Sequence, residues 1–243
     1  MEGKLKFITK NVVASDIWQL HFVKPSGFSH RAGQFIELNL PNGQADDRGT
    51  KRWFTISSAP DDSDIIITTR HVATKPSTFK QDIFDFESGD EIDFKGPDGK
   101  FVAPARDAKL LWIAGGIGAT PFISQLQSFL SESDLSRDIK LILGLRSLEE
   151  HPCMQLMRTA EQEMVNFSSN IVLSDVIPSG WSGKSGLIDL KLICDICPDY
   201  KERQIFVSGP EPMVDALKSR LLETGLDESM FHGDWFPGYS EKY

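Results

Sequence analysis

Arg52 belongs to a ten-residue stretch, KRWFTISSAP at positions 51–60, whose residue types suit a phosphorylated ring. A guanidinium group binds phosphate through paired hydrogen bonds, and Phe54 offers a flat ring on which another flat ring can stack. Thr55, Ser57 and Ser58 add hydroxyl groups, which a core strand does not need. The stretch therefore predicts a strand that holds a flat, polar, phosphorylated ligand. The alternative is an edge strand whose polar side faces water.

A first glycine-rich turn, AGGIGATPF, suits a second phosphorylated ligand. It carries Gly115, Gly116 and Gly118 just before an expected helix that begins near Thr120 and Pro121. Glycines let the backbone turn sharply and approach a ligand, and the start of a helix attracts negative charge. The turn lacks the GxGxxG fingerprint, so a tight turn that merely requires glycines stays open as the alternative.

A second turn, VSGPEPM, also places glycine between an apolar strand and a helix. Its central residues are Ser208, Gly209 and Pro210. In doubly wound sheets, ligands bind beyond the carboxyl ends of the strands. The two turns are therefore expected to flank one crevice.

Two halves of the chain, which differ in periodicity, must position these residues. Residues 1–104 contain short strands with alternating apolar and polar residues, separated by turns rich in Gly, Pro, Asn and Asp. This pattern predicts a six-stranded antiparallel β-barrel with one helix at residues 77–86. The strands are expected at residues 5–14, 17–23, 34–40, 53–58, 64–72 and 90–96.

Residues 105–243 alternate apolar strands with helical segments. This order predicts an α/β domain with a parallel sheet covered on both faces. The segment PARD at residues 104–107 is the expected link between the two domains. Strands are expected at residues 109–115, 139–145, 170–176 and 203–209, and helices at 119–130, 149–164 and 210–225, with Met213 in the core.

Composition narrows the class of protein. The 243 residues carry a formal net charge of −9, which argues against nucleic acid because Lys and Arg normally meet its phosphates. No apolar run approaches the roughly 18 residues of a transmembrane helix, and the first residues show no signal-peptide pattern. We expect a cytoplasmic protein without a membrane span.

Cysteine and histidine form no metal-binding pattern. Cys153, Cys194 and Cys197 are too few for an iron–sulfur cluster or a four-ligand zinc site, and they provide no disulfide framework. The pair in CDIC is interpreted as incidental cysteines in a loop or short helix. The five histidines are scattered, and His71 is the one most suited to approach a ligand because of its strand. No metal is expected.

Seven motifs follow one another along the chain: RWFTISS, KPSTF, GPDGKF, AGGIGATPF, GLRSLEE, SGPEPM and DWFPGY. In this order and spacing they resemble the ferredoxin–NADP reductase superfamily over residues 5–239. The resemblance implies a flavin-binding barrel followed by an NAD(P)-binding domain, without an iron–sulfur domain. It also implies FAD as cofactor, more often than FMN, and NADH or NADPH as co-substrate.

The resemblance further implies roles for individual residues. In the barrel, Arg52 is expected at the flavin phosphates, Phe54 along the flavin ring and Thr55 near its N5 atom. In the second domain, Ser208 is expected under the nicotinamide and Asp234 near the flavin, so that Thr55, Ser208 and Asp234 form the catalytic set. The other residues expected to bind cofactor or nucleotide are Trp53, Arg70, His71, Ser77, Thr78, Gly115, Gly116, Gly118, Thr120, Pro121, Arg146, Asp175, Gly209, Pro210, Trp235 and Phe236.

Some positions depart from the family pattern or bear on nucleotide choice. Phe54 stands where many members have tyrosine, and Ser208 where many have the more polarizable cysteine, so slower hydride transfer or looser docking is expected. Ser174 and Asp175 stand where NADP-dependent members often have an arginine for the 2′-phosphate. A carboxylate repels that phosphate but accepts hydrogen bonds from a ribose 2′-OH, which favours NADH. Arg146 remains a candidate phosphate ligand.

The expected activity is hydride transfer from NAD(P)H to bound FAD, followed by electron transfer to ferredoxin, flavodoxin or another redox partner. Three alternatives stay open. The chain could be an electron-transfer subunit of a larger complex, a flavin- or nucleotide-binding regulator without turnover, or a reductase that uses free flavin as its substrate.

Overall fold

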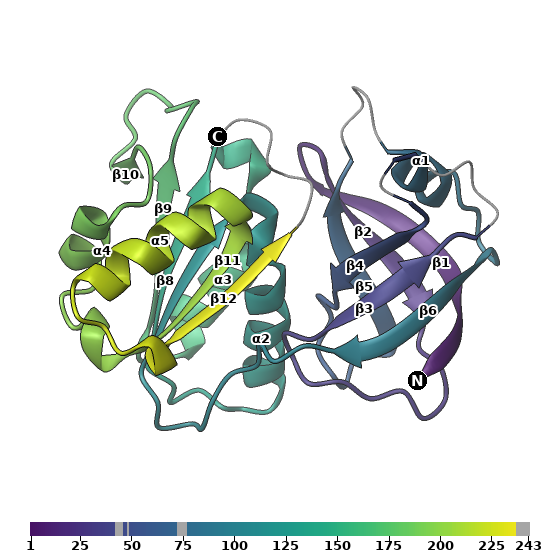
Figure 1. The fold of residues 1–243 in the computed structure, drawn as a ribbon, viewed down its shortest axis with the longest axis horizontal. Coiled ribbons are helices and arrows are strands. Elements are labelled where there is room, and N and C mark those ends of the chain that lie inside the picture. The colour runs from purple at the N-terminus through teal and green to yellow at the C-terminus, as the bar shows by residue number, and fades with distance from the viewer. Residues whose placement is uncertain (42–45, 48, 72–76, 237–243) are drawn as a thin grey trace. The chain divides into compact units, whose positions relative to one another are not determined.

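Figure 1 shows the computed structural model, which describes residues 1–41, 46–47, 49–71 and 77–236. The chain divides into two compact units. The first comprises residues 1–102 and 120–128, and the second comprises residues 103–119 and the chain from Phe129 onward. The domain boundary expected between residues 104 and 105 stays a prediction.

The first unit contains the predicted six-stranded antiparallel sheet, with strand order β4-β3-β6-β1-β2-β5. Two serines that follow β4 bond to β5 at the opposite end of this order. Ser57 N donates to Ile66 O (2.8 Å), and Ile66 N donates to Ser58 Oγ (3.1 Å). These bonds join the two ends of the sheet, as closure of a barrel requires. The elements are β1 (Glu2–Ala14), β2 (Ile17–Val23), β3 (Phe35–Asn39), β4 (Lys51–Thr55), β5 (Asp64–Arg70), α1 (Thr78–Phe84) and β6 (Glu91–Asp98).

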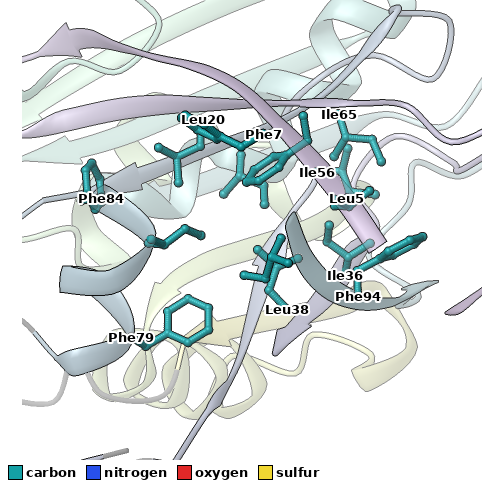
Figure 2. Close-up of a cluster of buried hydrophobic side chains, with 14 of the residues drawn as sticks. Leu5, Phe7, Leu20, Ile36, Leu38, Ile56, Ile65, Phe79, Phe84 and Phe94 are labelled. Carbon is teal, nitrogen blue, oxygen red and sulfur yellow. The ribbon is translucent and has the colours of Figure 1, made fainter. Parts of the chain in front are cut away.

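The core of this unit is lined by residues at alternate strand positions. Leu20 and Phe22 of β2, for example, are fully buried and lie two residues apart, as the period of a strand requires. Helix α1 contributes Phe79 and Phe84 to the same cluster, and Figure 2 shows both rings at the side of the cluster that faces the helix. The packing of these two rings fixes α1 against the sheet.

The second unit contains a six-stranded parallel sheet with strand order β10-β9-β8-β7-β11-β12. Helices α4 and α5 cover one face, where Ile193 and Leu217 join Leu111 and Ile113 of the central strand β7. On the opposite face, Trp112 stacks on Phe129 of α2 with ring centres 6.1 Å apart. The remaining elements of the chain are β7 (Leu110–Gly115), η1 (Gly116–Ala119), α2 (Thr120–Ser131), β8 (Ile139–Leu145), η2 (Leu148–Glu150), α3 (Met154–Glu163), β9 (Phe167–Leu173), β10 (Lys184–Ser185), α4 (Leu190–Ile196), η3 (Tyr200–Glu202), β11 (Gln204–Pro210), α5 (Glu211–Glu223), η4 (Glu228–Met230) and β12 (Phe231–Phe236). All belong to the second unit except α2, whose residues 120–128 belong to the first.

The structure differs from the sequence prediction in several elements. Strand β9 lies at Phe167–Leu173, three residues before its predicted place, and the short strand β10 was not predicted. Strand β12 was not predicted, although it pairs with β11 in parallel along its whole length. Helix α3 begins at Met154 rather than at residue 149, because the backbone of His151 is extended before Pro152 and proline disfavours the α conformation in the preceding residue. Strand β4 ends at Thr55, so Ser57 and Ser58 lie beyond it.

Two of the three cysteines, Cys194 and Cys197, lie on α4 and just after it, in agreement with the short helix that was one of the expectations. Over the described part of the chain, no helix combines the length and apolar character needed to cross a membrane.

Candidate functional site

Strand β4 presents the first group of expected site residues at the end of its sheet. Arg52 and Phe54 are partly buried, whereas the intervening Trp53 is 51% exposed on the other face. The Arg52 guanidinium lies 5.4 Å from the ring centre of Phe79 in α1, and the Phe54 ring lies 5.9 Å from the same ring. Arg52 and Phe54 therefore face α1, and the buried Thr55 ends the strand.

An acidic side chain links Arg52 to the first residues of α1. Asp46 Oδ1 accepts a hydrogen bond from Arg52 Nη2 (3.3 Å), and Asp46 Oδ2 accepts one from the Thr78 backbone N–H (3.2 Å). Ser77 caps the helix, since its Oγ accepts from Lys80 N (3.2 Å). The structure thus brings the expected phosphate ligands together, and a carboxylate already binds two of them. This cluster fits an anionic group such as a phosphate.

The hydroxyl groups of Ser57 and Ser58, which follow β4, form hydrogen bonds within the barrel. Ser57 Oγ bonds to Thr68 Oγ1 (2.7 Å) and to Ile66 O (3.0 Å). Ser58 Oγ accepts a hydrogen bond from Ile66 N (3.1 Å). Both serines are buried, so their polarity is explained by contacts within the protein.

Arg70 and His71, at the end of β5, contact other residues of the barrel. Arg70 Nη1 forms an ion pair with Asp16 Oδ2 (3.0 Å). The His71 ring packs on Phe84 with ring centres 4.2 Å apart. A role for either residue in cofactor binding stays a prediction.

Lys80 was missed in the sequence analysis. Its Nζ donates to Thr69 Oγ1 and to Arg70 O (3.1 Å) and lies 5.2 Å from the ring centre of Phe54. Burial first, and then the charge of Arg52, lower the pKa of Lys80 to about 7. The sequence does contain a signal for Lys80, because this lysine directly follows Phe79, an inward-facing residue of a short helix.

The first glycine turn packs directly against the end of β11. A Cβ atom added to Gly118 would lie 2.2 Å from Ser208 O, and one added to Gly115 would lie 2.8 Å from Met213 Sδ. Packing of the chain therefore requires these two glycines, which supports the alternative of a structural turn at these positions. Gly116 has a φ of 53°, a left-handed conformation that favours glycine. The two predicted turns do meet, and Met213, partly buried against the core, lies beside them.

Thr120 and Pro121 occupy the first turn of α2, as predicted, and both are buried. Their contact with a nucleotide stays a prediction. Lys75 and Pro76 of KPSTF and residues 237–239 of DWFPGY lie outside the described residues, and so does the side chain of Phe236.

Ser208 and Asp234 are neighbours on the parallel strands β11 and β12. Ser208 is fully buried, and its Oγ has no well-formed hydrogen bond to any described residue. Burial raises the pKa of Asp234 to about 6, while the nearby Ser208 hydroxyl acts weakly in the opposite direction. The pair thus combines an unsatisfied hydroxyl with a carboxyl group that changes protonation near neutral pH. Trp235, next in β12, is 47% exposed and is paired in register with Gly209.

Arg146 and Asp175, the residues expected to influence nucleotide choice, lie close together. The backbone N–H of Asp175 donates to Arg146 O (3.1 Å). The Arg146 guanidinium donates through Nε (3.0 Å) and Nη2 (2.6 Å) to Glu150 Oε1. A carboxylate therefore already offsets the charge of Arg146, and the Asp175 carboxylate accepts from Ser174 Oγ (2.8 Å). Glu150 is a second residue that the sequence analysis missed.

Comparison with known proteins agrees with this arrangement. Residues 112–219 match the model of the oxidoreductase NAD-binding domain family. The stachydrine N-demethylase reductase subunit of Rhizobium meliloti is 29% identical over 244 residues, which cover 98% of this chain and 68% of that protein. The glycine betaine monooxygenase reductase subunit of Pseudomonas aeruginosa is 30% identical over 217 residues, which cover 88% of this chain and 58% of that protein.

The fold is also that of a solved reductase. The crystal structure of a ferredoxin NADP+ reductase from Neisseria gonorrhoeae with bound FAD and NADP matches with a TM-score of 0.75 and 18% identity. The match covers 96% of this chain and 98% of that one. Both the barrel and the parallel sheet are therefore shared, and this chain spans between half and about two thirds of the curated relatives that it matches.

Proposed function

We propose that the chain belongs to the ferredoxin–NADP reductase superfamily and is an FAD-dependent NAD(P)H oxidoreductase that delivers electrons to a protein acceptor. The match of residues 112–219 to the oxidoreductase NAD-binding domain family and the fold shared with a solved reductase support this proposal. The observation that carries the proposal is the presence in one chain of two differently equipped sites. In the barrel, Arg52 and the backbone N–H of Thr78 both bind the carboxylate of Asp46, so they can bind an anionic group. The parallel sheet carries Ser208 and Asp234 at the carboxyl ends of neighbouring strands, where ligands bind in such folds.

FAD, when bound, supplies the redox chemistry by taking a hydride from NAD(P)H and passing electrons on singly or in pairs. The barrel residues bind and orient it. Arg52 binds a phosphate group in place of the Asp46 carboxylate, since a guanidinium fork suits either anion. Phe54 offers a stacking surface, and the hydroxyl of Thr55 offers a hydrogen bond to the ring system.

Ser208 and Asp234 act on the nucleotide side of the reaction. The Ser208 hydroxyl can donate to or accept from a bound nicotinamide nucleotide, which would satisfy its Oγ atom. With a pKa of about 6, a fraction of the Asp234 carboxyl groups carries a proton near neutral pH. Such a group is suited to general acid–base work. We assign Asp234 the role of holding and releasing this proton.

The preferred nucleotide in this proposal is NADH. A 2′-phosphate would meet the carboxylate of Asp175, and the nearby Arg146 is already engaged by Glu150 (2.6 Å). A ribose 2′-OH can instead donate to a carboxylate. Comparison of KM for NADH and NADPH checks this preference.

The acceptor is proposed to be the terminal component of an oxygenase. The two relatives described above are reductase subunits of a demethylase and a monooxygenase. This supports the alternative of an electron-transfer subunit that works with a partner. A cytoplasmic location is part of the same proposal.

Anaerobic reduction of the purified protein tests the proposed function. The protein is expected to retain FAD, to lose its visible flavin absorbance when NADH is added, and to do so more slowly with NADPH. Retained colour without bleaching by either nucleotide would favour a regulator. Failure to bind FAD at any concentration would refute the proposal.

A further inference from the structure

Lys80 places an amine among the aromatic rings on the inner side of α1. Its Nζ lies 5.2 Å from the ring centre of Phe54 and 5.8 Å from that of Phe84. The amine donates to Thr69 Oγ1 and to the carbonyl oxygen of Arg70 (3.1 Å). Both acceptors are neutral, and no carboxylate of the described residues forms an ion pair with Lys80.

The charges around Lys80 do not compensate its own. Arg52, on the neighbouring strand β4, is the one charged residue that shifts the pKa of Lys80, and it lowers that pKa. Lys80 is partly buried. A partly buried cation that faces another cation costs folding free energy, and an apolar side chain would pack here at lower cost. The charged groups on α1 and on the strands β4 and β5 beside it are Asp82, Lys51, Arg52, Asp64 and Arg70, besides Lys80 itself. Lys10, Asp16, Asp46 and His71 bond to or pack against these elements.

We propose that Lys80 is a second cationic ligand for the phosphate groups of the flavin, beside Arg52. This inference rests on the proposed function. Phe54 and Phe79 pack together, and the amine of Lys80 and the guanidinium of Arg52 lie against these two rings. Arg52 already has the Asp46 carboxylate beside it, whereas the acceptors of Lys80 are neutral, so a diphosphate would bring the negative charge that Lys80 lacks among the described residues. The flexible stem of lysine lets Nζ leave its carbonyl acceptor and reach the anion.

Binding of the anion must then be linked to binding of a proton. With its pKa of about 7 in the flavin-free chain, Lys80 is largely neutral at pH 8. A phosphate beside the amine favours the ammonium form and raises that pKa. FAD affinity is therefore expected to be highest below pH 7 and to fall as the pH rises, with uptake of nearly one proton per FAD at about pH 8 and almost none at about pH 6.

The test measures binding of FAD and of riboflavin, which has no phosphate, to flavin-free full-length protein. Lys80→Met is expected to weaken FAD binding about 10- to 100-fold at pH 6, as loss of a hydrogen bond to a charged group does, and to leave riboflavin binding unchanged. Lys80→Arg keeps the charge at every pH, so it should retain FAD affinity without the pH dependence. Lys10→Met is the matched control, because Lys10 also lies near a ring, Phe7 (6.0 Å), and bonds to backbone carbonyls.

Calorimetry in buffers of different ionisation enthalpy counts the protons taken up, and both Lys80 variants should show none. Equal loss of FAD and riboflavin affinity in Lys80→Met would overturn the inference, as would a Lys80→Arg protein that binds FAD as poorly as Lys80→Met. Equal FAD affinity in the wild type and Lys80→Met would overturn the inference about Lys80 alone. Absence of FAD binding by the wild type would overturn it together with the proposed function.

Discussion

Replacing Asp234 by asparagine removes a carboxyl group whose ionisation opposes folding. Burial raises the pKa of Asp234 from its ordinary 3.8 to about 6. Between these two values the folded protein binds more protons than the unfolded chain, so its stability falls as the pH rises through this window. Above the window the full cost remains, because the carboxylate is then ionised in both states.

The size of the effect follows from the shift. A difference of about 2.2 pKa units, at about 1.4 kcal/mol for each unit, corresponds to about 3 kcal/mol at pH 7. Asp234 is only partly buried, so water screens part of this cost, and we expect Asp234→Asn to gain about 1.5–3 kcal/mol in the free energy of unfolding. For a chain of this size, that gain raises Tm by roughly 3–10 °C.

Urea unfolding of the flavin-free protein at about pH 4 and about pH 7.5 measures the effect on both sides of the window. The stabilisation should appear at the higher pH and nearly vanish at the lower one. Asp227→Asn is the control, since hydrogen bonds from Ser229 lower the pKa of Asp227. Its carboxylate favours the folded state, so this variant should lose stability at the higher pH. An Asp234→Asn protein with the same change in stability at both pH values would contradict the reasoning.

Four further variants probe the second unit. Gly118→Ala would place Cβ 2.2 Å from Ser208 O and should lower the free energy of unfolding by at least about 3 kcal/mol in urea titrations. Gly144→Ala, whose Cβ meets the flexible end of Ile188 at 3.1 Å, should cost less than about 1 kcal/mol. Glu150→Gln removes the carboxylate that engages Arg146 and should lower KM for NADPH several-fold relative to NADH; an unchanged ratio would exclude Arg146 from nucleotide choice. Ser208→Cys should accelerate flavin reduction in anaerobic stopped-flow measurements. Equal rates in this variant and the wild type would show that serine at this position does not slow hydride transfer.

Elements with strong local patterns were predictable from the sequence. Strands β2 (Ile17–Val23) and β8 (Ile139–Leu145) begin and end at the predicted residues, because apolar runs are bounded there by turn residues. Strand β12 was missed since Gly233 and Asp234 interrupt its apolar pattern. Its existence depends on pairing with β11, and pairing between distant segments leaves no local signal.

The same holds for the residues of the site: those with a local sequence pattern were predictable, and those whose contacts come from distant segments were not. Arg52 and Phe54 were predictable because alternation along a strand puts both on one face. The acceptors of Lys80, on β5, come from a distant part of the sequence. The pair of Arg146 and Glu150 was within reach, since four residues separate two opposite charges in GLRSLEE.

Two kinds of environment surround the charged side chains that are wholly or partly buried, and the difference supports the assignment of the site. Arg203 is 2% exposed, yet it forms ion pairs with Asp138 (2.6 Å) and Asp199 (2.7 Å), and both pairs keep its charge favourable. The pKa of Arg203 is accordingly raised and that of Asp199 lowered. Lys80 and Asp234 shift the opposite way, because each lacks a partner of opposite charge and burial favours its neutral form. A chain under selection for stability alone would replace such groups, whereas a chain that must bind an anion in the barrel and move a proton at the sheet would keep them.

Substitution of Arg203 by methionine should therefore destabilise the protein. Substitution of Lys80 by methionine should instead raise the stability of the protein and weaken its binding of FAD. A Lys80→Met protein that is destabilised and still binds FAD fully would place Lys80 in the same class as Arg203.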